Sequence, residues 1–120
     1  MAEREVDQAL VERVQRGDKS AFDILVRKYQ HKVVKLVSRY VKDHHEVYDV
    51  AQEAFIKAYR ALPNFRGDSA FYTWMYRIAI NTAKNYLVAQ GRRLPQLQWS
   101  HQQASERGRP VQVVYPGIHR

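Results

Sequence analysis

Apolar residues recur with helical spacing along most of the chain. Near the N-terminus, a short helix is predicted by Val6, Leu10, Val11 and Val14. Gly17 is placed to end this helix, and Asp18 can cap the next one. From residue 19 to residue 42, the same 3.6-residue period predicts a long second helix with its apolar stripe at Phe22, Leu25, Val26, Tyr29, Val33, Leu36, Val37 and Tyr40.

The pattern resumes after a predicted connection at residues 42–46. A third helix is indicated by apolar positions at Val47, Val50, Ala51, Ala54, Phe55, Ala58, Tyr59 and Leu62. Pro63 stops this helix, and a polar, turn-rich loop follows it. Asp68 or Ser69 can then cap a fourth helix that runs through Ala89. Its inward face is predicted to carry Trp74, Ile78 and Leu87.

We therefore predict an all-α fold, a compact helical domain over residues 1–93 with three main helices and a short one before them. Gly91 is placed to end the last helix. Residues 94–120 hold three of the four prolines and show little periodicity, so we expect an irregular, mostly disordered tail. Its strand-like piece, VQVVY, has no predicted partner strand.

Composition narrows the classes of partner. A chain of 120 residues has room for one small domain. Its 20 Lys and Arg outnumber its 12 Asp and Glu, and the formal net charge of +8 favours nucleic acid, an acidic protein or an anionic membrane surface. The absence of cysteine excludes disulfides and thiolate metal sites. No apolar run approaches the roughly 20 residues that span a bilayer, so we expect a cytoplasmic protein without direct membrane insertion.

Few residues suit catalysis or metal binding. His44, His45 and Glu46 are adjacent, so on a helix their side chains point to different faces, unlike the paired histidines of a zinc protease. The sequence has no Ser-His-Asp motif and no thiol nucleophile. We expect no catalytic residue, no metal and no cofactor, and the protein is predicted not to be an enzyme.

Basic residues gather on two of the predicted helices. The second helix carries Arg27, Lys28, Lys32, Lys35 and Arg39, several of them on one stripe, which suits either phosphate binding or a solubilising outer face. From residue 69 to residue 93 the chain has no acid, and its cations are interleaved with Phe71, Tyr72, Trp74, Tyr76 and Tyr86. Aromatic faces beside cations are what single-stranded bases and their phosphates need.

The third helix carries a mixed acidic face. Asp49, Gln52, Glu53 and Ile56 follow the spacing i, i+3, i+4, i+7 and so share one side. Such a face suits a partner helix with basic residues, because exposed ion pairs orient binding. A merely solvated face gives the same pattern. The two carboxylates alone do not indicate acid-base chemistry or a metal site, because nothing nearby supplies the remaining groups.

The loop between the third and fourth helices is a candidate base-binding site. Its residues are Asn64, Phe65, Arg66, Gly67, Asp68, Ser69 and Ala70. Gly67 allows a close approach of backbone to ligand, Asn64 and Asp68 can read hydrogen-bonding edges, and Phe65 offers a ring face. Asn81 is placed to hydrogen-bond a base held against the loop. An ordinary helix connection explains the same composition.

Taken together, these residues resemble region 2 of a bacterial extracytoplasmic-function sigma factor of the sigma-E/AlgU envelope-stress class. The resemblance covers roughly residues 7–93, and its most specific stretches are QEAFIKAYRAL, FRGDSAFYTW and YRIAINTAKNYLVAQGRR. It implies a helical domain that binds RNA polymerase core and recognises the −10 promoter element as the element melts. Such a domain takes part in transcription initiation and regulation but makes and breaks no bond itself.

The resemblance also assigns roles to matching positions. Asp49, Gln52, Glu53 and Ile56 fall on the surface that docks on the clamp helices of polymerase. Residues 64–70 match the specificity loop that receives an extruded base of the non-template strand. Asn81 matches a residue that helps to hold this base, and contacts to DNA are expected at Lys57, Tyr76, Arg77 and Lys84. The family further implies an anti-sigma factor as a partner.

One feature of the family pattern is missing from the sequence. No helix-turn-helix pattern of the kind that reads the −35 element, region 4, appears in residues 94–120. We therefore expect a truncated or frameshifted product whose last residues are out-of-frame or linker sequence, and which initiates transcription poorly or not at all. Two other interpretations stay open: a protein that only titrates polymerase or an anti-sigma factor, and a nonspecific basic binder of nucleic acid.

Overall fold

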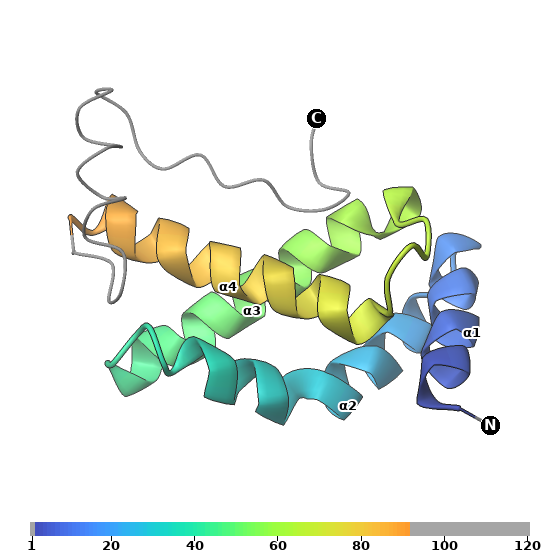
Figure 1. The fold of residues 1–120 in the computed structure, drawn as a ribbon, viewed down its shortest axis with the longest axis horizontal. Helices are drawn as coiled ribbons and strands as arrows, with labels where there is room; N and C mark the ends of the chain where they lie inside the picture. The colour runs from blue at the N-terminus through green and yellow to red at the C-terminus, as the bar shows by residue number, and fades with distance from the viewer. Residues whose placement is uncertain (1, 92–120) are drawn as a thin grey trace.

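The computed structural model describes residues 2–91, which fold into helices joined by short connections (Figure 1). The elements are α1 (Glu3–Gln15), α2 (Lys19–Val37), α3 (His44–Ala61), the 3-10 helix η1 (Leu62–Asn64) and α4 (Phe71–Ala89). The predicted all-α fold is confirmed. The predicted tail, together with Arg92 and Arg93, lies outside the described residues.

The three long helices pack side by side, and α1 lies across one end of them (Figure 1). In this position α1 contacts α2, η1 and the neighbouring end of α4. The loop from α3 to α4 passes the same end, so α1 and the loop are close in space although they are far apart in the sequence.

The predicted apolar stripes form one continuous core. Trp74, Ile78 and Leu87 of α4 are almost fully buried, at 2%, 0% and 3% exposure. The stripes of α1, α2 and α3 meet them through residues that include Val11, Leu25, Val33, Ala54 and Ala58. Small residues at the last two positions let α3 and α4 approach closely. Within residues 2–91, no helix is long and apolar enough to cross a membrane.

The second helix is shorter than predicted. It ends at Val37 rather than near Lys42, and the chain continues through turn hydrogen bonds from the Arg39 and Tyr40 amides to carbonyls three residues earlier. The Ser38 hydroxyl donates to the Lys35 carbonyl at 2.6 Å, which competes with continuation of the helix. The apolar pattern does not reveal where this helix ends, because Tyr40 and the fully buried Val41 still pack on the core beyond its last residue.

The third helix begins earlier than predicted, at His44. The Asp43 carboxylate accepts hydrogen bonds from the amides of His45 and Glu46 at 2.9 and 3.1 Å and so caps the helix. His44, His45 and Glu46 therefore form its first turn and not a connection. Within residues 2–91, no group of three His, Cys, Asp or Glu side chains is arranged to hold a metal ion.

The cap predicted for the fourth helix is also wrong. Ala70 occupies the N-cap position, and no side chain caps the helix. The Ser69 hydroxyl donates instead to the Ala70 carbonyl at 3.4 Å, while Asp68 lies 3.8 Å from Arg66. The other end agrees with the prediction, because α4 stops at Ala89 and Gly91 follows with a φ of +75°.

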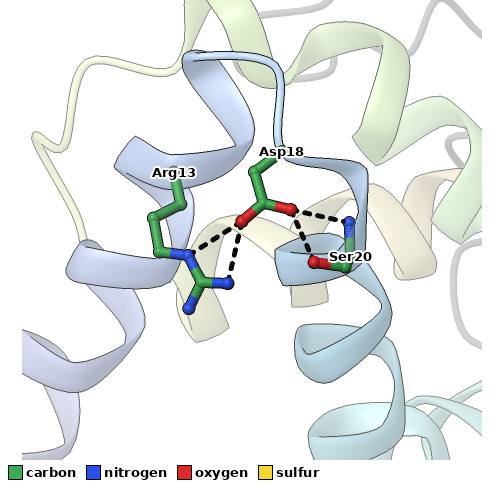
Figure 2. A network of polar contacts seen from close by, with 3 residues as sticks. All are labelled: Arg13, Asp18 and Ser20. Atoms are coloured by element: carbon green, nitrogen blue, oxygen red, sulfur yellow. Dashed lines mark hydrogen bonds and ion pairs between the residues drawn. The ribbon is translucent and has the colours of Figure 1, made fainter.

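A capping network joins α1 to α2. As Figure 2 shows, one carboxylate oxygen of Asp18 accepts from the Arg13 guanidinium at 3.0 and 2.8 Å, and the other accepts from the amide and hydroxyl of Ser20. The connection passes through Gly17, whose φ of +105° suits glycine. Asp18 thus caps α2, as predicted, and also holds the last turn of α1.

Replacing Asp18 should destabilise the domain in a pH-dependent way. The hydrogen bonds from Ser20, and then Arg13, lower the pKa of Asp18 from 3.8 to about 2. A lowered pKa in the folded state means that this stabilisation is complete above pH 3.8 and is lost as the pH falls through about 2. We expect Asp18→Ala to lower the Tm by several degrees at pH 7, and the difference from the wild type to shrink between pH 4 and pH 2.

Asp18→Asn is the matched control, because asparagine also caps helices but does not pair with Arg13. It should lower the Tm less than Asp18→Ala at pH 7. Thermal unfolding followed by circular dichroism measures both effects. A Tm difference between wild type and Asp18→Ala that stays constant down to pH 2 would contradict the role given to the carboxylate.

Candidate nucleic-acid and protein interfaces

Aromatic packing fixes both ends of the loop between α3 and α4. The ring centroid of Phe65 lies 4.7 Å from that of Trp74, and Phe71 lies 5.9 Å from the same indole. Phe65 and Phe71 also meet edge to face at 6.5 Å. Both ends of the loop pack on the buried Trp74 side chain. Residues 66–70 therefore form a short loop that is anchored at both ends.

The polar tip of the loop faces solvent. The side chains of Arg66 and Asp68 are 83% and 82% exposed, and Asn64 is also exposed. Gly67 has a φ of +80°, which side chains other than glycine rarely adopt, whereas a Cβ there would make only ordinary 3.6 Å contacts with Gln8. The backbone shape, rather than lack of space, therefore requires glycine.

Phe65 does not present the open ring face that was expected. Its side chain is only 7% exposed because it packs into the core against Trp74. The sequence places this residue in a polar loop, where burial is not evident from spacing. Its direct contact with DNA stays a prediction. Its observed packing on Trp74 anchors the start of the loop to the core.

Sequence reasoning missed that α1 touches the loop. The Gln15 side-chain amide donates to the backbone carbonyls of Leu62 and Phe65, both at 2.9 Å. The Arg4 guanidinium donates to the Gly67 carbonyl at 3.4 Å. No local sequence signal predicts such contacts, because the partners are 47 to 63 residues apart.

The outer face of α4 carries the predicted polar residues. Arg77 is exposed, whereas Asn81 and Lys84 are half-buried, and the Lys84 ammonium lies 6.0 Å from the centre of the Tyr40 ring. Asn81 lies ten residues beyond Phe71, about 15 Å along the helix axis. Asn81 is thus separated along α4 from the loop, which ends at Ala70, and its contact with a base stays a prediction.

Tyrosines border this face on the α2 side. Tyr72 and Tyr76 are half-buried with ring centroids 4.3 Å apart, and the Lys32 ammonium lies 5.1 Å from the centre of the Tyr72 ring. Burial, and then a hydrogen bond with Tyr72, raises the pKa of Tyr76 to about 12. Tyr76 thus stays neutral well above pH 7, and part of its ring is covered by Tyr72.

The basic stripe of α2 is not uniform. Lys28 pairs with Glu3 and, at 2.6 Å, with the buried carboxylate of Asp7, which also accepts a hydrogen bond from the Tyr29 hydroxyl. Burial raises the pKa of Asp7, and the Tyr29 hydrogen bond opposes this rise. Lys28 thus has a structural partner, whereas Arg27, Lys32 and Lys35 face solvent.

The acidic face lies on the outer side of α3. Asp49, Gln52 and Glu53 are exposed, as is Ile56 at 46%. Together with Lys57 and Arg60 they line a shallow hollow. Lys57, predicted to contact DNA, forms an ion pair with Glu53 at 3.5 Å and therefore sits on this face, and its contact with DNA stays a prediction.

A largely apolar groove of about 430 Å³ lies between α2 and α3, beside the acidic face. Phe22, Val26 and Phe55 are among the apolar residues that line it. Its wall includes Tyr48, which is 48% exposed, and shares Gln52 and Ile56 with the acidic face. Exposed apolar side chains beside a polar rim are typical of surfaces that bind proteins.

These features define a small helical binding module with an acidic face on α3 and a basic, aromatic face on α4. The chain belongs to the sigma-70 region 2 family, whose model matches residues 25–93. Family membership confirms the resemblance seen in the sequence and the prediction that the protein is not an enzyme. The matched residues include all the predicted site residues but none of α1.

Two curated relatives show how far the similarity extends. RNA polymerase sigma-H factor from Pseudomonas aeruginosa is 75% identical over 95 residues, which are 79% of this chain and 49% of the relative. ECF RNA polymerase sigma-E factor from Escherichia coli strain K12 is 73% identical over 95 residues, with the same coverage. The chain therefore spans about half the length of the curated relatives it matches.

A solved structure supports the fold. It is the NMR structure of an engineered region 2 of sigmaE in complex with GTAAAA. Its sequence is 66% identical to this one, and the TM-score is 0.69. The match covers 76% of this chain and 95% of the solved chain, so nearly all of the engineered region 2 has a counterpart here.

Proposed function

We propose that this domain binds the single-stranded −10 element of a promoter and, through a separate face, the core of RNA polymerase during transcription initiation. The main support is its 66% identity to an engineered region 2 of sigmaE that was solved with GTAAAA. The loop at residues 64–70 and the outer face of α4 supply the polar, cationic and aromatic groups that a melted strand needs.

We treat the loop and Asn81 as two subsites, and their separation suits a single strand of about six nucleotides. A stacked single strand rises about 3.4 Å per nucleotide, so the roughly 15 Å between the start of α4 and Asn81 corresponds to four or five nucleotides. GTAAAA has six. We propose that the loop and Asn81 hold different bases of one strand.

The base specificity of Asn81 can be tested directly. A side-chain amide makes up to two hydrogen bonds to a base edge, and one good base contact changes discrimination by about 1–3 kcal/mol. We expect Asn81→Ala to weaken binding of GTAAAA about tenfold and to remove the preference for one base of the strand. Fluorescence anisotropy with single-base variants of GTAAAA measures both quantities.

Gln30→Ala is the control, because it removes an exposed amide from α2. It should leave both affinity and base preference unchanged. Equal affinity and equal preference in wild type and Asn81→Ala would contradict the role of Asn81. A wild-type affinity that is strongly salt-dependent but indifferent to base sequence would instead favour the nonspecific binder.

The acidic face of α3 is the proposed polymerase interface. Asp49, Glu53 and the exposed Ile56 combine charge for orientation with an apolar contact at the centre of the face. The Glu53 side chain is 57% exposed, so solvent screens its ion pair with the half-buried Lys57 and the pair contributes little to folding. These carboxylates can therefore be reversed in sign without a large loss of stability.

Replacing both Asp49 and Glu53 with Lys should abolish co-purification of core polymerase, because like charges would then face a basic partner. The matched control replaces Glu5 and Glu12, two exposed acids of α1, with Lys and makes the same change in net charge. A pull-down of core polymerase measures the difference. Unchanged recovery with the Asp49 and Glu53 double variant would rule out this face.

An anti-sigma factor is the third proposed partner, and the groove between α2 and α3 supports a protein ligand beside the polymerase face. Because Gln52 and Ile56 belong to both surfaces, an occupant of the groove would compete with polymerase. Binding to polymerase and promoter also places the proposed activity in the cytoplasm.

A further inference from the structure

The entrance to the loop is held by a side chain from α1. Gln15 is the last residue of α1, and its amide nitrogen donates to the carbonyls of both Leu62 and Phe65 at 2.9 Å. An NH₂ group has two hydrogens, so one amide can serve both acceptors. These two carbonyls lie at the start of η1 and immediately after it, where the chain leaves α3 for the loop.

The same side of α1 reaches the tip of the loop. Arg4 donates to the Gly67 carbonyl at 3.4 Å, and the Gln8 amide lies beside the Cα of Gly67. Residues 4, 8 and 15 fall within about 40° of one another around a helix with 3.6 residues per turn. One stripe of α1 therefore follows the loop from its first residues to its glycine.

This stripe is itself held in place by contacts with α2. The buried Asp7 carboxylate binds the Tyr29 hydroxyl and the Lys28 ammonium, the latter at 2.6 Å. At the other end of α1, Arg13 pairs with Asp18 at 2.8 Å (Figure 2). Breaking the buried Asp7–Lys28 pair would be costly. We therefore expect α1 to keep a fixed position beside the loop.

We propose that Gln15 is a positioning residue that sets the base discrimination of the loop by fixing the carbonyls of Leu62 and Phe65. This inference rests on the proposed function, because it assumes that residues 64–70 receive a base. The support comes from a helix that precedes the family match at residues 25–93. The proposed support for the loop thus comes from residues that the family model does not match.

The physical effect of losing Gln15 is a freer loop. The Phe65 amide donates to the Leu62 carbonyl at 3.0 Å, the same carbonyl that Gln15 binds. Each hydrogen bond from Gln15 has a modest net value, so removing two should lower the hydrogen-exchange protection of the Phe65 amide by about tenfold. A base pocket that samples more shapes discriminates less between bases. The contacts that we propose between α4 and the DNA phosphates do not involve residues 64–70. The overall affinity for DNA and its salt dependence should therefore change little.

The experiment compares two variants that remove the donor in different ways. Gln15→Met is uncharged and similar in length, and Gln15→Glu is isosteric but acidic. Each full chain is titrated with GTAAAA and its single-base variants, and hydrogen exchange is measured at the Phe65 amide. Both variants should lose severalfold discrimination at one nucleotide only. Gln15→Lys, whose ammonium can donate to the same carbonyls, should restore it, and Gln30→Met should have no effect.

Three results would overturn the inference. Unchanged discrimination in both Gln15 variants, with the wild type discriminating normally, would refute the positioning role and leave the proposed function intact. An equal loss of affinity for every oligonucleotide would indicate general destabilisation instead. A wild type that does not discriminate at any position would refute the proposed function, and the role of Gln15 with it.

Discussion

The packing of Phe65 and Phe71 on Trp74 is the contact on which both proposed binding surfaces depend. These three rings join the end of α3 to the start of α4, and the indole between them is only 2% exposed. The contact fixes where the loop leaves the core and returns to it. Together with the packing of Ala54 and Ala58 of α3 in the same core as Ile78 of α4, it holds the two helices in place.

The two proposed surfaces differ in charge. The outer face of α3 presents Asp49 and Glu53, while α4 has no acidic residue from Phe71 to Ala89. The buried Asp7 neutralises Lys28 at the junction of α1 and α2, so that cation contributes less to the outer field than Lys32 or Lys35. With a net charge of +8, the chain as a whole favours approach to nucleic acid, and the acidic face provides a local exception.

Much of the fold could be predicted from local pattern. The stripes that become the core, the Asp18 cap and the glycine after α4 are all local features, and each was found in the sequence. Errors arose where two local signals competed. Tyr40 and Val41 pack on the core outside the helix, and Asp43 starts α3 ahead of its first apolar residue. Such competition is decided by tertiary contacts rather than by propensity.

The candidate site was less predictable because its geometry depends on contacts distant in sequence. Helical spacing alone places Asp49, Gln52, Glu53 and Ile56 on one side of α3, and these residues line one hollow together with Lys57 and Arg60. The role of this face in binding stays a prediction. The burial of Phe65 and the hydrogen bonds from Gln15 depend on where α1 and Trp74 lie after folding. The buried Asp7 was missed for the same reason, since an acid near the N-terminus gives no sign of a tyrosine partner 22 residues later.

A chemical-shift map of the ¹⁵N-labelled full chain titrated with GTAAAA tests most directly whether the loop and α4 bind the strand. If they do, the largest changes should occur at residues 64–70 and along the outer face of α4 around Arg77, Asn81 and Lys84. The acidic face of α3 should stay unchanged, because it is assigned to a different partner. Changes concentrated on α3, or spread along the basic side of α2 without the loop and α4, would contradict the division of the domain into these two surfaces.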